Sequence, residues 1–219
     1  MTPDYSRAAT AAAETLIKYG ISSAPVDPLP ILKKIPGVLV LSYENLADDL
    51  GEPRRCVMHM FGKHSLDAVT SVNLTGGKTQ YLVTYNQQLS VNLIQRALAR
   101  ELAHIVLGHD GSLPEDVRME EARAFANHLL APRAMIHAIQ ATNLRLTVEV
   151  LGNLTGCYDY CLSCMRKQPG VHVDPELNRK VRDQFLPYIK NYFEYQRYAS
   201  LSDNSALADF GSYMEGYEE

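Results

Sequence analysis

Hydrophobic positions recur with helical spacing near the start of this chain and in short strand-like runs after it. Ala8, Ala12 and Leu16 lie on one stripe of a helix predicted for residues 3–19, which ends at Gly20. A turn at residues 25–28 leads into a short helix. The apolar runs that follow predict a strand over 38–41, a helical turn over 43–50, and strands over 56–61, 68–74 and 80–85.

From residue 90 onward the pattern becomes helical throughout. The last two strands flank Thr75-Gly76-Gly77-Lys78, which predicts a hairpin loop. The predicted helices span residues 90–107, 115–130, 133–140, 147–155, 158–167 and 174–198. Because a strand-rich part precedes a helical part, the order predicts an α+β fold and not alternating α/β.

The length of 219 residues suits one domain with a small appendage. We expect residues 1–140 to form the main domain, with a short, mostly antiparallel sheet packed on the helices at 90–107 and 115–130. Residues 141–198 are expected to form a helical extension packed on it. The segment 199–219, rich in Ser, Asp and Glu, is expected to be a flexible acidic tail.

Composition narrows the classes of function. Hydrophobic residues make up 46% of the chain, enough for a core, and the net charge of −4 argues against a broad nucleic-acid surface. The N-terminal segment lacks the apolar stretch of a signal peptide, and no run approaches the ~20 apolar residues of a membrane span. The four cysteines suit reduced thiols. These features predict a cytoplasmic protein without a membrane partner.

The chemistry is concentrated in the helix at 90–107, which contains Arg100-Glu101-Leu102-Ala103-His104. Zinc peptidases carry the pattern H-E-x-x-H on such a helix. Two histidines one turn apart share a helix face and bind one metal ion, while the glutamate takes a proton from the zinc-bound water. Here Arg100 stands at the place of the first histidine.

The next helix supplies a second, more specific pattern, from Glu121-Ala122 through Phe125-Ala126 to Pro132. Together the two helices resemble the ImmA/IrrE family, the M78-type metallopeptidases of prophages and stress regulators. There the first helix reads A-H-E-x-x-H-x-x-L-x-H and the second E-A-x-x-F-A-x-E-L-L-x-P. The resemblance extends over most of residues 1–198 and implies a zincin-like minimal metallopeptidase domain.

The resemblance implies a role for several residues. His104 and Glu121 would be metal ligands, and Glu101 the catalytic base. The strand at 80–85 would lie at a sheet edge beside the Arg100–His104 cleft and hold a peptide by strand addition. Its residues Tyr81, Val83 and Tyr85 are therefore the candidate substrate-binding residues.

Arg100 departs from this ligand set because a guanidinium stays protonated and offers no lone pair to a metal. Two ligands remain where a site of this type needs three. His109 is a poor substitute, because five residues past His104 is about 140° around a helix. His128 shares a face with Glu121 but lies roughly 10 Å further along. We instead expect Arg100 to pair with Glu121 in the space of the metal.

The leading hypothesis is a degenerate metallopeptidase-like protein, with zinc absent or weakly bound. It would act on or bind a repressor-type, helix-turn-helix transcription regulator of a mobile element or stress response. The alternative is an active zinc endopeptidase with a rearranged ligand set, so the pattern leaves open whether the chain is an enzyme.

Two further patterns in the C-terminal part of the chain have both a functional and an ordinary structural interpretation. Residues 146–167 have a helix–Gly–helix pattern, but little positive charge precedes Arg166, so a DNA-binding module ranks third and direct nucleic-acid binding is not expected. Cys157, Cys161 and Cys164 share one helical face, which favours buried small side chains over an iron–sulfur site.

Overall fold

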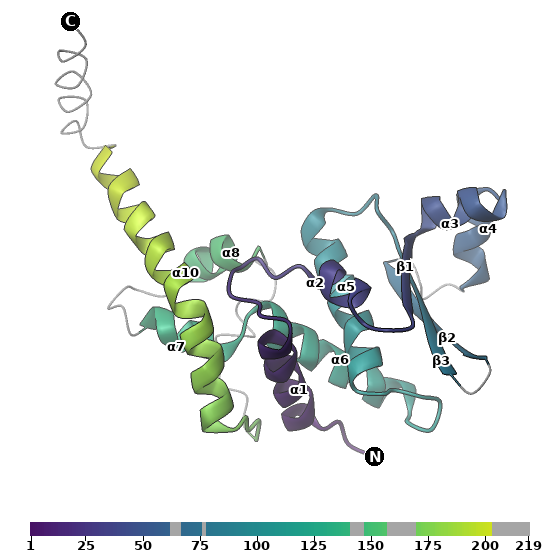
Figure 1. Ribbon diagram of the computed structural model, residues 1–219, viewed down its shortest axis with the longest axis horizontal. Coiled ribbons are helices and arrows are strands. Elements are labelled where there is room, and N and C mark those ends of the chain that lie inside the picture. The colour runs from purple at the N-terminus through teal and green to yellow at the C-terminus, as the bar shows by residue number, and fades with distance from the viewer. Residues whose placement is uncertain (62–66, 76–77, 141–146, 157–169, 203–219) are drawn as a thin grey trace, which may run out of the picture.

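The structure is a computed structural model that describes residues 1–61, 67–75, 78–140, 147–156 and 170–202. A small sheet with two short helices forms one end of the molecule, and the long C-terminal helix lies at the other end (Figure 1). The described elements are, in chain order, α1 (Tyr5–Lys18), α2 (Pro28–Lys33), β1 (Val38–Ser42), α3 (Tyr43–Leu50), α4 (Arg54–Met60), β2 (Ala68–Thr75), β3 (Lys78–Tyr85), α5 (Val91–Val106), α6 (Glu115–Leu130), α7 (Arg133–Gln140), α8 (Val148–Thr155) and α10 (Pro175–Ser202).

The sheet has the strand order β1-β3-β2 in the described part of the chain. β2 and β3 form the predicted antiparallel hairpin, with Thr75 opposite Lys78, and β1 pairs parallel to β3. Val40, Val83 and Thr70 are aligned across the three strands, so they point to one face of the sheet. Val83 is fully buried in the main core on this face, against which α5 packs.

The helices α5 and α6 pack against each other and carry the centre of the core, as the apolar spacing predicts. α1 packs against α6, with Ala8 and Ala12 buried on one helix and Ala122 on the other. Small side chains let the two helix backbones approach closely, and this proximity sets the position of the N-terminal segment relative to α6.

The C-terminal helix α10 packs against α7 and α1. Its residues Val181, Phe185 and Ile189 recur every four positions and are buried, so they form the apolar face of the helix predicted at 174–198. The helix continues to Ser202, four residues into the segment expected to be a tail. The expected helix at 158–167, the three cysteines Cys157, Cys161 and Cys164, and residues 203–219 lie outside the described residues.

The strand predicted for residues 56–61 is wrong, because Arg54–Met60 form the helix α4. Val57 is fully buried, and Met58 and Phe61 pack with it against Tyr43 and Ala47 of α3. Positions three or four residues apart share a helix face, so a helix buries this short apolar run on one side. Periodicity alone does not separate a helix from a strand in so short a segment.

No helix in the described ranges is long and apolar enough to cross a membrane. The other predicted elements in those ranges are present with ends shifted by a few residues, and the α+β order is confirmed.

Glycines at two turns provide a test of how closely β1 packs beside β3. Gly37, before β1, has φ +80, and a Cβ there would meet the carbonyl oxygen of Thr79 at 3.0 Å. Gly51 ends α3 with φ +65, and a Cβ at that position would have no atom within 4 Å. Both substitutions by alanine carry the left-handed backbone cost of about 1–2 kcal/mol, but only Gly37→Ala also pushes β1 away from β3.

We therefore expect Gly37→Ala to lower the free energy of unfolding in urea by more than Gly51→Ala does. The excess should reach about 1 kcal/mol, the usual cost of overpacking at a close contact. Equal losses in the two variants would show that the turn at Gly37 relaxes without disturbing the β1–β3 pairing.

Candidate functional site

The end of α5 folds the chain back on itself and brings two histidines together. The backbone N–H of His109 donates to the carbonyl oxygen of His104 at 2.9 Å, and that of Gly108 donates to Ile105 at 3.2 Å. Gly108 has φ +62, so the turn has the two hydrogen bonds and the left-handed residue of a Schellman motif. His109 therefore lies beyond the helix. The expectation that it would project about 140° around the helix from His104 is wrong, because that angle holds only for residues within the helix.

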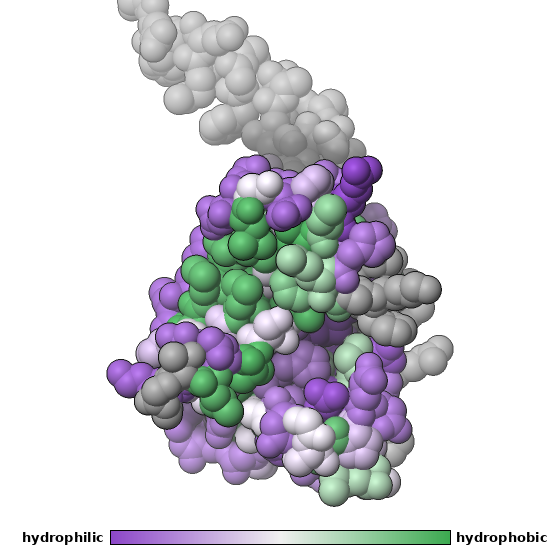
Figure 2. Space-filling view, turned by 90° about the vertical axis from the view of Figure 1, so that its right-hand side faces the viewer, coloured by the Kyte–Doolittle hydropathy of each residue, from purple (hydrophilic) through white to green (hydrophobic). Residues whose placement is uncertain are grey.

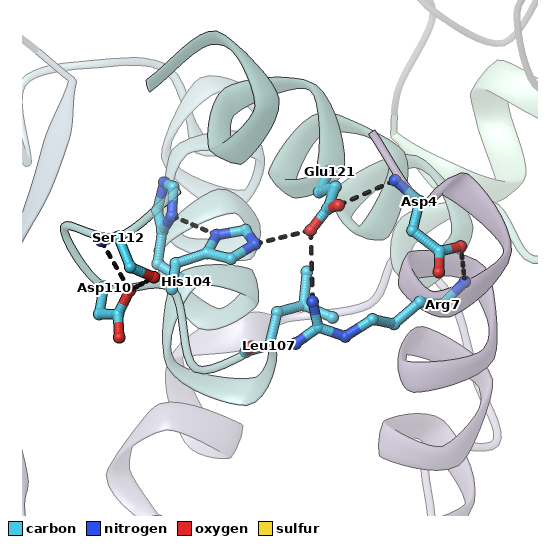
Figure 3. Close-up of polar contacts among 8 residues, drawn as sticks. Asp4, Arg7, His104, Leu107, Asp110, Ser112 and Glu121 are labelled. Carbon is cyan, nitrogen blue, oxygen red and sulfur yellow. Dashed lines mark hydrogen bonds and ion pairs between the residues drawn. The ribbon is translucent and has the colours of Figure 1, made fainter. Parts of the chain in front are cut away.

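His104, His109 and Glu121 form a chain of hydrogen bonds between α5 and α6. The two Nδ1 atoms of His104 and His109 lie 2.8 Å apart, and Nε2 of His109 lies 3.0 Å from Oε2 of Glu121. Figure 3 shows the dashed contacts that lead from His104 to Glu121. A carboxylate only accepts, so Nε2 of His109 donates to Glu121, and Nδ1 of a neutral His109 accepts from His104.

Glu121 receives two further contacts from the N-terminal segment. The backbone N–H of Asp4 donates to Oε1 at 2.8 Å, and Nη1 of Arg7 lies 3.6 Å from Oε2 (Figure 3). Arg7 also donates through Nη2 to the carbonyl oxygen of Leu107 at the end of α5. The Glu121 side chain is 4% exposed. Its buried charge is therefore met by donors from α1 and from the turn after α5.

The arrangement of these side chains does not fit a zinc ion. Zinc ligands converge on one point at about 2.0–2.2 Å from the metal. Here the His109 ring separates His104 from Glu121, and its two nitrogens, which point apart, are both engaged. Within the described ranges, no group of three or more His, Cys, Asp or Glu side chains has the geometry of a metal site.

Arg100 does not pair with Glu121, so the expected ion pair is wrong. Its Nη2 lies 3.2 Å from Oδ2 of Asp67, which immediately precedes β2. Glu121 is already surrounded by His109, Arg7 and Asp4. The Arg100 side chain, 25% exposed, instead joins α5 to the edge of the sheet.

Glu101, the candidate catalytic base, is buried beside the sheet. Thr70 of β2 donates from Oγ1 to Oε2 of Glu101 at 2.7 Å. Burial raises the pKa of the Glu101 carboxyl above its ordinary value, while the Thr70 hydrogen bond and the Arg100 charge act in the opposite direction. The side chain is held in one orientation and faces the same cleft as His104.

A cleft of about 760 Å³ runs between β2, the end of α5, the following loop and the start of α6. β3 lies at the sheet centre and is paired on both sides, so strand addition to residues 80–85 is excluded. Of the three candidate substrate-binding residues on β3, Tyr81 lines the cleft, while Val83 is buried in the core. β2 is the strand that lines the cleft and forms the sheet edge in the described part of the chain.

Sequence reasoning missed four residues that shape this site: Asp4, Arg7, Asp67 and Thr70. Only Thr70 carried a signal, because it shares one face of a predicted strand with Ala68, Val72 and Leu74. The others act from neighbouring segments far away in the sequence. His128 lines a separate pocket with His137 and His172, so it is not a substitute ligand in the cleft.

Comparison with known proteins identifies one family. Residues 58–154 match the family model described as the IrrE N-terminal-like domain of the M78 peptidases. The match runs from the end of α4 to α8 and includes Arg100, Glu101, His104, His109 and Glu121, whereas Asp4 and Arg7 precede it. A search of curated proteins and a search of solved structures gave no significant match.

The role of Glu121 as the buried acceptor is testable with two neighbouring glutamates of α6. In Glu121→Gln the amide would turn a donor toward Arg7 or His109 and remove the charge, so we expect a loss of about 2–4 kcal/mol in the free energy of unfolding. Unfolding in urea, followed by circular dichroism, measures the loss.

The matched control is Glu120→Gln, because Glu120 is 43% exposed and pairs with Arg123 at 2.7 Å on the surface. This variant should lose less than about 1 kcal/mol. Similar losses at both positions would mean that the Glu121 contacts do not hold α1 and α5 together.

His104 provides a pH test. Burial, followed by His109 and the Arg118 and Arg100 guanidiniums, lowers the pKa of His104 to about 4. The unfolded chain, with a histidine pKa near ~6.5, binds the proton first, so the contribution to stability is full above that pH and declines as pH falls toward the folded pKa. We expect the His104 ring signal, assigned by its loss in His104→Ala, to stay unchanged in NMR spectra from pH 8 to about pH 5.5. A midpoint near the unperturbed histidine value would contradict the burial of a neutral ring.

Proposed function

Because the chain belongs, through residues 58–154, to the IrrE N-terminal-like family of M78 peptidases, we propose that it binds a protein partner without zinc-dependent cleavage. The partner class is a repressor-type transcription regulator of the helix-turn-helix kind, from a mobile element or a stress response. The protein is then a degenerate metallopeptidase whose cleft has kept its binding role.

The observation that carries the proposal is the position of the His109 ring between His104 and Glu121. Both ring nitrogens of His109 are engaged, and the Arg7 guanidinium supplies positive charge to the Glu121 carboxylate. Arg100, at the place of the first family ligand, is turned to Asp67. A catalytic zinc ion needs three converging ligands and an open position for water, and this arrangement lacks both.

The cleft supports the binding half of the proposal. Its volume of about 760 Å³ accommodates several residues of an extended segment. β2 offers the hydrogen-bonding groups of an edge strand along this cleft, and an added strand pairs main chain to main chain. The proposed site of strand addition is therefore β2, and not β3 as the sequence suggested.

The competing function is a zinc endopeptidase that uses His104, His109 and Glu121. These three side chains are neighbours, and a rotation of the His109 ring would be needed for all three to converge. Metal content separates the two functions without knowledge of the partner.

We expect the wild-type protein to purify with well under one zinc per chain, measured by inductively coupled plasma mass spectrometry. Arg100→His should bind zinc more tightly than wild type, because it restores two imidazoles one helical turn apart. A synthetic library of random octapeptides incubated with wild type and added zinc should remain uncleaved in mass spectra.

Arg96→His is the matched control, since it makes the same substitution one turn earlier on α5 and outside the cleft lining. It should leave zinc affinity unchanged. One zinc per wild-type chain, lost in His104→Ala and accompanied by peptide cleavage, would establish the zinc endopeptidase instead. If Arg100→His binds no more zinc than Arg96→His, the family ligand geometry does not hold for this chain.

A further inference from the structure

Three of the four acidic side chains that line the cleft have partners within the protein. Asp67 pairs with Arg100 at 3.2 Å, and Glu101 accepts the Thr70 hydroxyl at 2.7 Å. Asp110 accepts both the backbone N–H and the hydroxyl of Ser112, which lowers the pKa of its carboxyl. Glu115, the fourth acidic residue of the lining, is exposed to solvent.

Arg118 of α6 differs in this respect from Arg100, the other arginine that lines the cleft. Its Nε is buried and has no hydrogen-bond partner, and none of the ion pairs between described side chains includes it. The side chain lines the cleft, and its charge lowers the pKa values of His104 and Asp110. No hydrogen bond or ion pair between described residues engages this guanidinium, so it remains for an acceptor that enters the cleft.

The other cleft surfaces favour a peptide as the source of that acceptor. Val72 and Leu74 of β2 are 55% and 76% exposed and, with Tyr81, lie on the cleft side of the sheet. The space-filling view of the sheet end shows apolar residues gathered beside a polar stretch of surface (Figure 2). An apolar wall along an edge strand suits the side chains of an added strand, whose alternate residues point to one face.

The geometry points to Arg118 as a carboxylate-binding residue of the cleft, which receives an acidic side chain or the C-terminal carboxylate of an extended peptide lying along β2. A guanidinium binds a carboxylate through two parallel N–H donors. Asp67, Asp110 and Glu115 also line the cleft, and their negative charge disfavours a doubly charged phosphate there. A singly charged carboxylate on one guanidinium is the better match.

This inference rests on the proposed function, because it names the chemistry of the segment that the cleft binds. It also assigns Arg118 a role in binding and none in stability. In the free protein the Nε group makes no contact that a substitution would break, so Arg118→Gln is expected to fold with an unchanged thermal midpoint.

The test is affinity selection by the full chain from the random octapeptide library, prepared once with free and once with amidated C-termini. Mass spectrometric sequencing should show Asp or Glu enriched among the bound peptides, or binding restricted to the free-acid library. Enrichment in both libraries identifies a side-chain carboxylate, and retention of free acids only identifies the terminal one. The selected peptides should bind Arg118→Gln at least about tenfold more weakly, the usual effect of losing a charged hydrogen bond.

Two control variants distinguish a failure of the carboxylate site at Arg118 from a failure of peptide binding by the cleft as a whole. Arg123→Gln, on the same helix but exposed and paired with Glu120, should bind the peptides as wild type does. Val72→Trp, which fills the apolar part of the cleft, should weaken all of them. Peptides that depend on Val72 but show no carboxylate preference would overturn the role of Arg118 and leave the proposed function intact.

Two other outcomes are equally decisive. A library from which the wild type retains nothing, or peptides that bind Val72→Trp as tightly, would overturn the proposed function together with the inference. An Arg118→Gln variant that fails to fold would show that Arg118 is structural and would overturn the carboxylate site.

Discussion

The buried carboxylate of Glu121 is the constraint around which the centre of the molecule is arranged. A charge at 4% exposure is stable only with donors on every side, and here they come from two segments. Asp4 and Arg7 approach from α1 and the residue before it, and His109 approaches from the turn after α5. The same carboxylate therefore fixes how α1, α5 and α6 meet.

This arrangement sets the hydrogen-bond partners of the two residues that were expected to bind a metal. Glu121 and His104, which the family resemblance predicts as metal ligands, contact the His109 ring from opposite sides. The Arg7 guanidinium adds positive charge from outside the segment that matches the family. The positive charge beside Glu121 thus comes from the protein itself. The N-terminal helix α1 loses flexibility because it must stay packed in place to supply this charge.

The sheet and the cleft are connected to this centre through two polar contacts. Arg100 reaches Asp67, and Glu101 reaches Thr70, so consecutive residues of α5 both contact the edge strand β2 or the residue before it. The edge strand is thereby held over the cleft, with Val72 and Leu74 exposed beside Arg118. An edge strand held in this way, in the cleft that Arg118 also lines, supports the proposal that the cleft binds an extended ligand.

The sequence predicted the elements best where apolar spacing was long and regular. The helical spacing over residues 174–198 predicted α10, and the spacing over residues 90–107 predicted α5. The run at residues 56–61 was misread because so short an apolar run suits a strand and a helix equally. Its helical form depends on packing against Tyr43, which the run itself does not encode.

By itself the sequence determined the α+β order, the two central helices, the family resemblance that residues 58–154 carry, and the fact that Arg100 offers no lone pair to a metal. These follow from local periodicity, from the motif on two adjacent helices and from the chemistry of single side chains. Only the tertiary structure decided that β3 is central and β2 the edge, that Arg100 turns to Asp67, and that His109 lies between His104 and Glu121. Each of these depends on which distant segments come within hydrogen-bonding distance, and a buried charge selects its partners by proximity in space, which spacing along the chain does not reveal.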